Sequence, residues 1–287
     1  MGQDFVWVRR LAVAGLIILA CGTASAEGVH RIALVSDPHV SGKLQDEAYL
    51  RHFSAVIEEV NAAGVEAVLI AGDLTQGGAV EDMGRFKEMV KGFHAKVWFV
   101  AGNHDVGNKV QAGQKTSLSE KRLKTFAEQV GPLYFSEEVV PGVRVVGICS
   151  SLMGGGLEEE KGQWEFLEKS LPAKGGEAVV VLTHYPPFVS KIDEADAYWN
   201  MNKAPRERLM GMIDGAGVKT VLSGHLHRPI EYTAGGVHVI GAPAVSFGLP
   251  RGKQPEGWVL VTVGEGGKCE GELKYLPMDA ATKPAGK

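Results

Sequence analysis

The chain has 287 residues, of which 45% are hydrophobic and 22% are charged. This composition supplies enough apolar material for a sizeable core, and the 38 glycines follow no collagen-like period, so low-complexity disorder is excluded. The formal net charge is −4, without long runs of one sign. Nucleic-acid binding and anionic-membrane binding driven by bulk charge are therefore disfavoured.

The first 26 residues have the pattern of a secretory signal peptide. Arg9 and Arg10 precede an apolar stretch over residues 11–20, and an Ala-Ser-Ala cleavage site covers residues 24–26. A transmembrane anchor is the weaker alternative because it needs roughly 20 apolar residues. Lipidation at Cys21 is a second alternative. We therefore expect an exported protein, periplasmic or secreted, without stable membrane insertion after signal cleavage.

Short β-branched runs alternate with amphipathic helical stretches along the rest of the chain, which predicts an α/β sandwich. The expected strands cover residues 31–36, 67–71, 96–101, 143–150, 178–183 and 219–223, and the expected helices cover residues 46–63, 80–93, 118–130, 162–171 and 205–216. Beyond residue 223, hairpin-connected strands are expected at 230–233, 237–240, 258–263 and 272–275. No linker is long enough to divide residues 27–277, so we predict one domain, followed by a flexible tail over 278–287.

Side chains that bind metals follow the expected strands at five points of the chain. These clusters are Asp37 with His39, Asp73 alone, Asn103 with His104 and Asp105, His184 alone, and His225 with His227. The carboxyl ends of strands in an open α/β sheet line one edge, so clusters far apart in sequence can converge there. Carboxylate, imidazole and amide oxygen suit Mn, Fe or Zn. The sequence therefore predicts a site for a pair of cations, and the lone Asp73 is free to bridge them.

Each cluster taken alone has an ordinary alternative. A single histidine at a strand end is more often a hydrogen-bonded surface residue than a ligand, and that reading is kept for the four histidines outside the clusters: His30, His52, His94 and His238. Asp73 and Asp105 alone would fit turns or helix caps. Because five clusters occur together, each at a strand end, we favour the metal site.

The ordered motifs resemble the calcineurin-like metallophosphoesterase superfamily over roughly residues 31–277. The motifs are Asp37-x-His39, Gly72-Asp73, Gly102-Asn103-His104-Asp105, His184 and Gly224-His225-x-His227. The resemblance implies a four-layer αββα sandwich of two mixed sheets with a dinuclear centre. The two ions would be divalent or trivalent, with Mn, Fe and Zn left open.

The resemblance also implies a role for each residue of the motifs. One metal would be held by Asp37, His39 and His227, and the other by Asn103, His184 and His225, with Asp73 as the bridge. His104 would be a catalytic residue that Asp105 orients. Gly72-Asp73 continues as Leu74-Thr75-Gln76, so the tyrosine ligand of purple acid phosphatases is missing and no purple chromophore is expected.

Three stretches, residues 102–108, 162–167 and 223–228, are similar to a smaller group that contains the eukaryotic calcineurin-like phosphoesterase domain-containing protein 1. The resemblance implies hydrolysis of a phosphate ester by a metal-bridging hydroxide, with His104 assisting the leaving group. The favoured substrates are phosphomonoesters, phosphoproteins among them. The alternatives are a phosphodiesterase for cyclic nucleotides or glycerophosphodiesters, and a metal-binding module without catalysis.

Several further points stay open at the level of sequence. The loops over residues 152–156 and 198–200 either shape specificity or are solvated connectors. Signal cleavage would leave Cys149 and Cys269 in a compartment that permits a disulfide, but a free structural cysteine at position 149 is favoured. The oligomeric state has no signature, and no nucleic-acid partner is expected.

Overall fold

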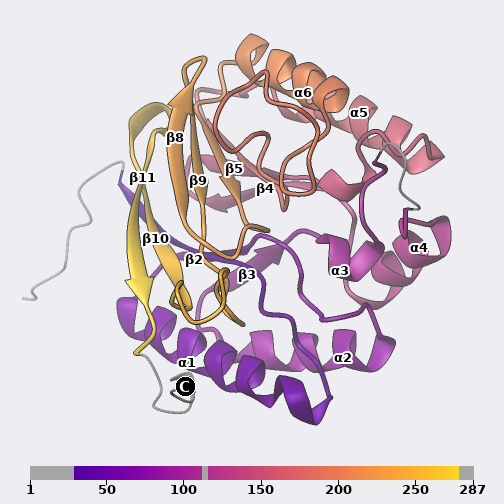
Figure 1. Cartoon of the computed structure of the whole chain (residues 1–287). Helices are drawn as coiled ribbons and strands as arrows, with labels where there is room; N and C mark the ends of the chain where they lie inside the picture. Colours follow the sequence, from indigo (N-terminus) through magenta and orange to yellow (C-terminus); the bar gives the residue numbers. More distant parts are fainter. Residues whose placement is uncertain (1–28, 112–115, 278–287) are drawn as a thin grey trace, which may run out of the picture.

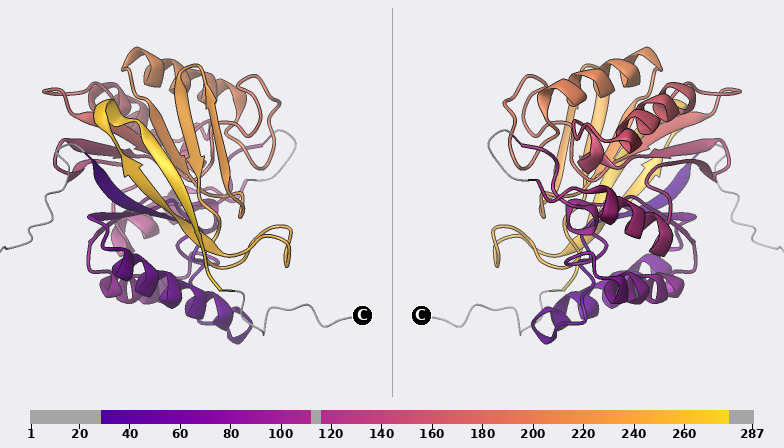
Figure 2. Two further views of the ribbon diagram at one scale, coloured as in Figure 1. Left: turned by 90° about the vertical axis from the view of Figure 1, so that its left-hand side faces the viewer. Right: turned by 90° about the vertical axis from the view of Figure 1, so that its right-hand side faces the viewer.

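A computed structural model describes residues 29–111 and 116–277. The predicted signal peptide, Cys21 and the predicted tail lie outside these residues. Two β-sheets face each other, and helices cover the outer side of each sheet (Figures 1 and 2). The predicted αββα sandwich is thereby confirmed. Within the described ranges, no helix combines the length and the apolar character that crossing a membrane requires.

The first sheet has five strands in the order β11-β10-β1-β2-β3. Its three adjacent parallel strands are β1 (His30–Val35), β2 (Ala67–Ile70) and β3 (Lys96–Phe99). Strand β10 (Gly257–Val263) pairs antiparallel with β1, and β11 (Cys269–Tyr275) pairs antiparallel with β10. Helices α1 (Glu47–Ala63), α2 (Val80–Met89) and α4 (Glu120–Gln129) cover its outer face. The end of the chain thus completes the sheet that its beginning starts.

The second sheet has six strands in the order β4-β5-β6-β7-β9-β8. The strands are β4 (Phe135–Val140), β5 (Val143–Gly147), β6 (Ala178–Leu182), β7 (Thr220–Ser223), β8 (Ile230–Ala234) and β9 (Val237–Gly241). Strands β5, β6, β7 and β9 are parallel, while β4 and β8 are antiparallel edge strands. Helices α5 (Glu158–Ser170) and α6 (Lys203–Gly215) cover the outer face.

Alternation along the strands separates the layers of the core. In β1, Ile32 and Leu34 pack between the two sheets, whereas Ala33 and Val35 pack on the outer face with Phe53 of α1. This is the period of two that a strand buried on both faces requires. Helix α1 ends at Gly64, whose φ of 63° gives the left-handed conformation that commonly terminates helices.

Some elements differ from the sequence prediction. Strand β4 was not predicted. It is an edge strand, and the exposed Glu137 and Glu138 in its middle interrupt the run of apolar residues by which a strand is recognised in the sequence. Helix α5 begins at Glu158, four residues before the predicted start, with three glutamates in its first turn that complement the helix dipole. Helix α2 ends at Met89 and continues as a 3₁₀ turn (Val90–Gly92); the other 3₁₀ turns are Leu44–Asp46, Ser150–Leu152 and Glu265–Gly267.

Cys149 and Cys269 are both buried and free, so no disulfide links them. Burial raises the pKa of the Cys149 thiol to about 12 and that of Cys269 to about 11. Both are therefore neutral, unreactive core residues, as predicted for Cys149.

Candidate metal centre

The carboxyl ends of five strands meet at one edge of the sandwich. Asp37 and His39 follow β1, Asp73 follows β2, and Asn103 opens the short helix α3 (Asn103–Val106) after β3. From the second sheet, His184 follows β6, and His225 and His227 follow β7. Both sheets therefore contribute residues to one site.

The site consists of two buried clusters that share Asp73. The first contains Asp37, His39, Asp73 and His227, and the second contains Asp73, His184 and His225; within each cluster the candidate ligand atoms lie within 4.8 Å of one another. Asn103 Oδ1 lies 3.0 Å from His184 Nε2 and so adjoins the second cluster. The structure thus gathers all seven residues in the two predicted groups, with Asp73 between them, while their roles as ligands stay predictions.

Hydrogen bonds to backbone carbonyls fix the orientation of three imidazoles. His227 Nδ1 lies 2.7 Å from Phe247 O, and His184 Nδ1 lies 2.7 Å from Ala71 O. His225 Nε2 lies 3.1 Å from Tyr198 O. Because a carbonyl oxygen only accepts, each ring donates an N–H there and turns its other nitrogen toward the cluster, which is the arrangement of metal-binding histidines.

With the imidazoles neutral, as metal binding requires, the inward-facing atoms are nearly all hydrogen-bond acceptors. His184 Nε2 lies 3.1 Å from His225 Nδ1, and His39 Nε2 lies 3.2 Å from His227 Nε2. Asp37 Oδ1 is buried and has no hydrogen-bond donor among the described residues. Lone pairs that face one another out of contact with water are unfavourable unless positive charge lies between them. The donor set therefore fits two cations, each bound by nitrogen and oxygen ligands.

Backbone conformation also marks these residues. In the described part of the chain, the non-glycine residues with positive φ are Asp37, His39, Asp73, His225 and His227, with φ from 47° to 72°. Left-handed conformations cost energy for residues with a Cβ and concentrate at functional sites. Each turn is made directly after a strand, and it aims the side chain back across the sheet edge.

The electrostatics of the site favour carboxylates over carboxylic acids. Burial opposes ionisation of Asp37, but the charge of the neighbouring His227 outweighs this and holds the pKa of Asp37 well below its usual value. Burial likewise lowers the pKa of His184, but Asp73 outweighs it and raises that pKa to about 9. Burial and the charge of His184 lower the pKa of His225 to about 3. The clusters thus hold carboxylates that call for compensating positive charge.

His104 differs from the buried residues because its side chain is 33% exposed. Its Nδ1 lies 2.8 Å from the carbonyl oxygen of Gln76, and its Nε2 lies 4.0 Å from Asp73 Oδ2. The carbonyl fixes Nδ1 as the donor, so Nε2 faces the centre from the solvent side. This placement suits a group that exchanges a proton with a substrate.

The structure corrects the role predicted for Asp105. Its carboxylate accepts hydrogen bonds from the amides of Gly102, Leu74 and Thr75 and from the Thr75 hydroxyl. Adjacent helical residues point in different directions, so Asp105 cannot face the ring of His104 within α3. Asp105 instead joins α3 to the loop after β2, and the Gln76 carbonyl orients His104.

Two residues near the site were not predicted. Arg122 of α4 donates from Nη2 to the carbonyls of His104, Asp105 and Gly77, at 2.6, 3.2 and 3.3 Å. The Tyr198 hydroxyl lies 3.3 Å from Asn103 Nδ2, and the Tyr198 ring lies 4.9 Å from that of His225. Both lie far from the motifs in sequence, so only the fold places them beside the site. For Tyr198, the sequence alone leaves open that the loop over residues 198–200 shapes specificity.

Comparisons with known proteins agree with this geometry. The profile of the calcineurin-like phosphoesterase family matches residues 30–229. Human serine/threonine-protein phosphatase CPPED1 is 30% identical over 171 residues, which are 57% of this chain and 51% of that protein. A probable glycerophosphodiester phosphodiesterase, GpdQ, of Arcobacter nitrofigilis is 30% identical over 167 residues, 57% of each chain. The structure of yellow lupin purple acid phosphatase PPD1 has a TM-score of 0.60 at 14% identity, covering 86% of this chain and 51% of that one.

The chain belongs to the calcineurin-like phosphoesterase family, because the profile covers well over half of its length. The similarity to several CPPED1 proteins supports the predicted nearness to that group. The alignments span about half the length of the curated relatives that the chain matches. The lupin enzyme shares the fold, but the chain has no tyrosine directly after Gly72-Asp73.

Proposed function

We propose that the protein is a metal-dependent phosphoesterase that hydrolyses phosphate monoesters, phosphoproteins among them. One observation carries the proposal: two buried clusters of candidate ligand atoms share Asp73, and the partly exposed ring of His104 places Nε2 4.0 Å from that shared carboxylate. A pair of bound cations would activate water as the nucleophile and neutralise the phosphoryl oxygens. Family membership and the similarity to CPPED1 support the same reaction class.

Each residue of the site would then have a distinct role. Asp37, His39 and His227 would hold one cation, and Asn103, His184 and His225 the other, with Asp73 on both. The carbonyls behind the imidazoles keep the bare nitrogens inward, so the ligands need no reorganisation when cations bind. His104 Nε2 faces the space above Asp73 and, in the protonated form of the imidazole, would give its proton to the leaving oxygen. Such proton transfer typically contributes about 10² to 10⁴ in rate.

Purified protein loaded with Mn²⁺, Fe²⁺ or Zn²⁺ tests the proposal with para-nitrophenyl phosphate as substrate. We expect two metal ions per chain and turnover that chelation abolishes and metal restores. Stoichiometric metal without turnover of any ester would overturn the proposal and would favour the non-catalytic metal-binding module.

A phosphodiesterase is the second candidate. The probable glycerophosphodiester phosphodiesterase GpdQ and human CPPED1 are both 30% identical to this chain over 57% of its length. The bis ester of para-nitrophenol separates the two. A higher kcat/KM on the bis ester than on the monoester would favour the diesterase, and turnover of the monoester alone would favour the phosphatase.

We also propose that the protein is exported to the periplasm or secreted. The signal-peptide pattern over residues 1–26 supports this proposal, and lipidation at Cys21 is the alternative. The mass of the protein purified from its native host tests it. Export predicts a mature chain beginning at Glu27, lipidation predicts a chain beginning at a modified Cys21, and an intact Met1 with a cytosolic location would contradict both.

A further inference from the structure

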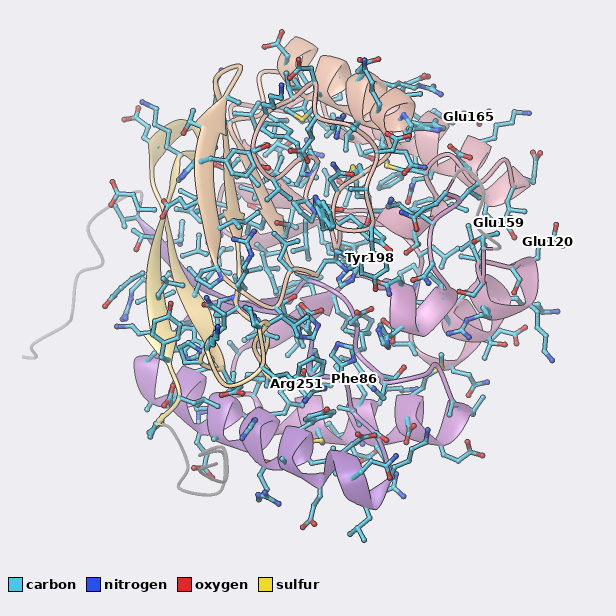
Figure 3. All side chains as sticks on the ribbon, in the orientation of Figure 1. Phe86, Glu120, Glu159, Glu165, Tyr198 and Arg251 are labelled. Atoms are coloured by element: carbon cyan, nitrogen blue, oxygen red, sulfur yellow. The ribbon has the colours of Figure 1, made fainter. Side chains whose placement is uncertain are left out.

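A cavity of about 480 Å³ opens beside the candidate metal centre. His225, a candidate ligand, lines it together with Tyr198, Trp199, Arg228, Leu249 and Pro250. Figure 3 shows Tyr198 in the middle of the view, between the helices α5 and α6 on one side and α1 and α2 on the other. Hydrolysis by the two clusters and His104 does not by itself require this cavity.

Both walls of the cavity are hydrogen-bonded to candidate ligands. On one wall, the Tyr198 carbonyl accepts from His225, which belongs to the second cluster. On the other wall, the Leu249 amide donates to the carbonyl of His227 at 2.9 Å, and His227 belongs to the first cluster. The cavity therefore adjoins the second cluster through His225, and its other wall is joined by a backbone hydrogen bond to His227 of the first cluster.

The lining is aromatic and exposed although its loop is well anchored. Trp199 is 52% exposed, Tyr198 45% and Leu249 41%. Yet Asn200, next to Trp199, is fully buried; its Oδ1 accepts from the Ala197 amide at 3.0 Å, and Lys109 Nζ donates to the Ala197 carbonyl at 2.7 Å. The loop thus presents two aromatic side chains to solvent from a fixed backbone, which is the arrangement of a preformed binding surface.

The cavity has one formally charged residue in its lining, Arg228. Its exposed guanidinium makes no ion pair with any residue that the structure describes. The lining therefore offers a ligand two aromatic side chains and a single positive charge. The lining contains no carboxylate side chain, which would favour a cationic ligand.

We propose that this cavity is the leaving-group subsite and that it selects phosphate esters of phenol-like alcohols that carry an acidic substituent. The inference rests on the proposed function. The aromatic ring would stack on Trp199 and Tyr198, and the acidic substituent would pair with Arg228. In the reaction, the oxygen of water bonds to phosphorus, the bond from phosphorus to the phenolic oxygen breaks, and the phenolic oxygen takes up a proton.

The first test compares phenyl phosphate with glycerol 1-phosphate on the Mn²⁺-loaded enzyme. Trp199→Ala should lower the ratio of kcat/KM for the aryl ester to that for the alkyl ester about fivefold relative to the wild type, since an aromatic stack is removed. The ratio compares the two proteins, so the higher intrinsic reactivity of the aryl ester cancels. Leu273→Ala is the control because it removes a similarly exposed apolar side chain from β11, and it should leave the ratio unchanged.

The second test compares 4-carboxyphenyl phosphate with phenyl phosphate. Arg228→Gln should lower kcat/KM for the carboxylated ester about threefold more than for phenyl phosphate, and salt should reduce the difference. Unchanged ratios in both variants, with normal turnover, would overturn the subsite.

Binding measurements separate this inference from the proposed function. If the wild type hydrolyses no ester, the proposed function fails, and calorimetry with phenylphosphonate and methylphosphonate decides the subsite. Tighter binding of phenylphosphonate that Trp199→Ala abolishes would support the subsite. Equal binding of the two phosphonates would overturn it.

Discussion

Gly102 lies so close to Asp73 that a methyl group on its Cα would overlap both the amide nitrogen and the carboxylate of Asp73. The contact joins the loop after β3 to the loop after β2, and it places the shared carboxylate where both clusters can reach it. Gly224 plays the equivalent part in the second sheet, since a Cβ there would overlap the hydroxyl of Ser36. Gly102 thus lets the loops of two neighbouring strands approach closely, and Gly224 lets the loop after β7 approach the end of β1 in the other sheet.

Gly102→Ala should therefore displace Asp73 and cost both metal and activity. Overpacking of a buried contact typically costs about 1–3 kcal/mol, so the variant should fold with reduced stability. We expect less than one metal ion per chain and at least a tenfold loss of kcat/KM, measured by metal analysis and turnover. Gly84→Ala in α2 is the control, because nothing lies within 4 Å of its added methyl group. Full metal content in Gly102→Ala would contradict the importance of this contact.

Asp73→Asn and His104→Asn should separate metal binding from proton transfer. Asp73 belongs to both clusters, so its amide variant should lose metal and activity together. His104 lies outside both clusters, so its variant should keep two metals while kcat falls about 10²-fold or more. Metal analysis and turnover of the two purified variants check this. An Asp73→Asn enzyme with wild-type metal content and activity would refute the bridging role.

The left-handed conformation of His39 predicts an unusual order of stability among its variants. His39→Gly should be more stable than His39→Ala in metal-free protein, because alanine keeps the strain at φ 47° and glycine does not. The left-handed region costs a residue with a Cβ about 1–2 kcal/mol, which exceeds the usual advantage of alanine over glycine. Urea unfolding of both variants without metal measures the difference. The opposite order would mean that the backbone relaxes once the imidazole is gone.

Acid should loosen the loop that carries Tyr198 and Trp199. Burial raises the pKa of Glu194, but hydrogen bonds from Asn200, Ser190 and Val189 outweigh this and lower it to about 2. A carboxyl group whose folded pKa is depressed stabilises the fold fully above its unfolded value near 4.5, and this contribution is lost as the pH falls toward 2. Hydrogen exchange in residues 189–202, corrected for intrinsic rates, should therefore increase between pH 4.5 and pH 3.

Variants of two neighbouring acidic residues test the cause of that change. Glu194→Gln should show fast exchange already at pH 7 and little further change in acid. Asp193→Asn should behave like the wild type, because the Asp193 side chain is 68% exposed and makes only a long contact with Lys191. Equal pH dependence in the wild type and in Glu194→Gln would assign the effect to another group.

The strand pattern and the order of the motifs predict most of the fold and the composition of the site. Buried β-branched runs identify β1, β2, β3, β6 and β7, and the residue types that follow each strand identify the seven candidate ligands. Strand β4 is not predicted because its polar and exposed residues give the sequence pattern of an edge strand and not that of a buried one. The hairpin strands were expected, but their division between the two sheets depends on tertiary packing.

Contacts made by backbone atoms are the part of the site that the sequence does not reveal. The carbonyls of Gln76, Ala71 and Phe247 orient three histidines, and any residue type would supply such an oxygen. Arg122 and Tyr198 reach the site from positions 18 and 95 residues away from their partners, His104 and Asn103. The misassignment of Asp105 has a related cause, because adjacency in sequence was taken for contact although helical neighbours diverge.

The division of the seven candidate ligands between the two sheets bears on biosynthesis. Asp37, His39, Asp73 and Asn103 precede β4, whereas His184, His225 and His227 belong to the second sheet. A nascent chain that has emerged only through α3 therefore carries four of the seven side chains and neither cluster in complete form. If these residues bind the two ions, the sites become complete only after more than three quarters of the polypeptide has been made, and hydrolytic competence would arise late, when both sheets have packed together.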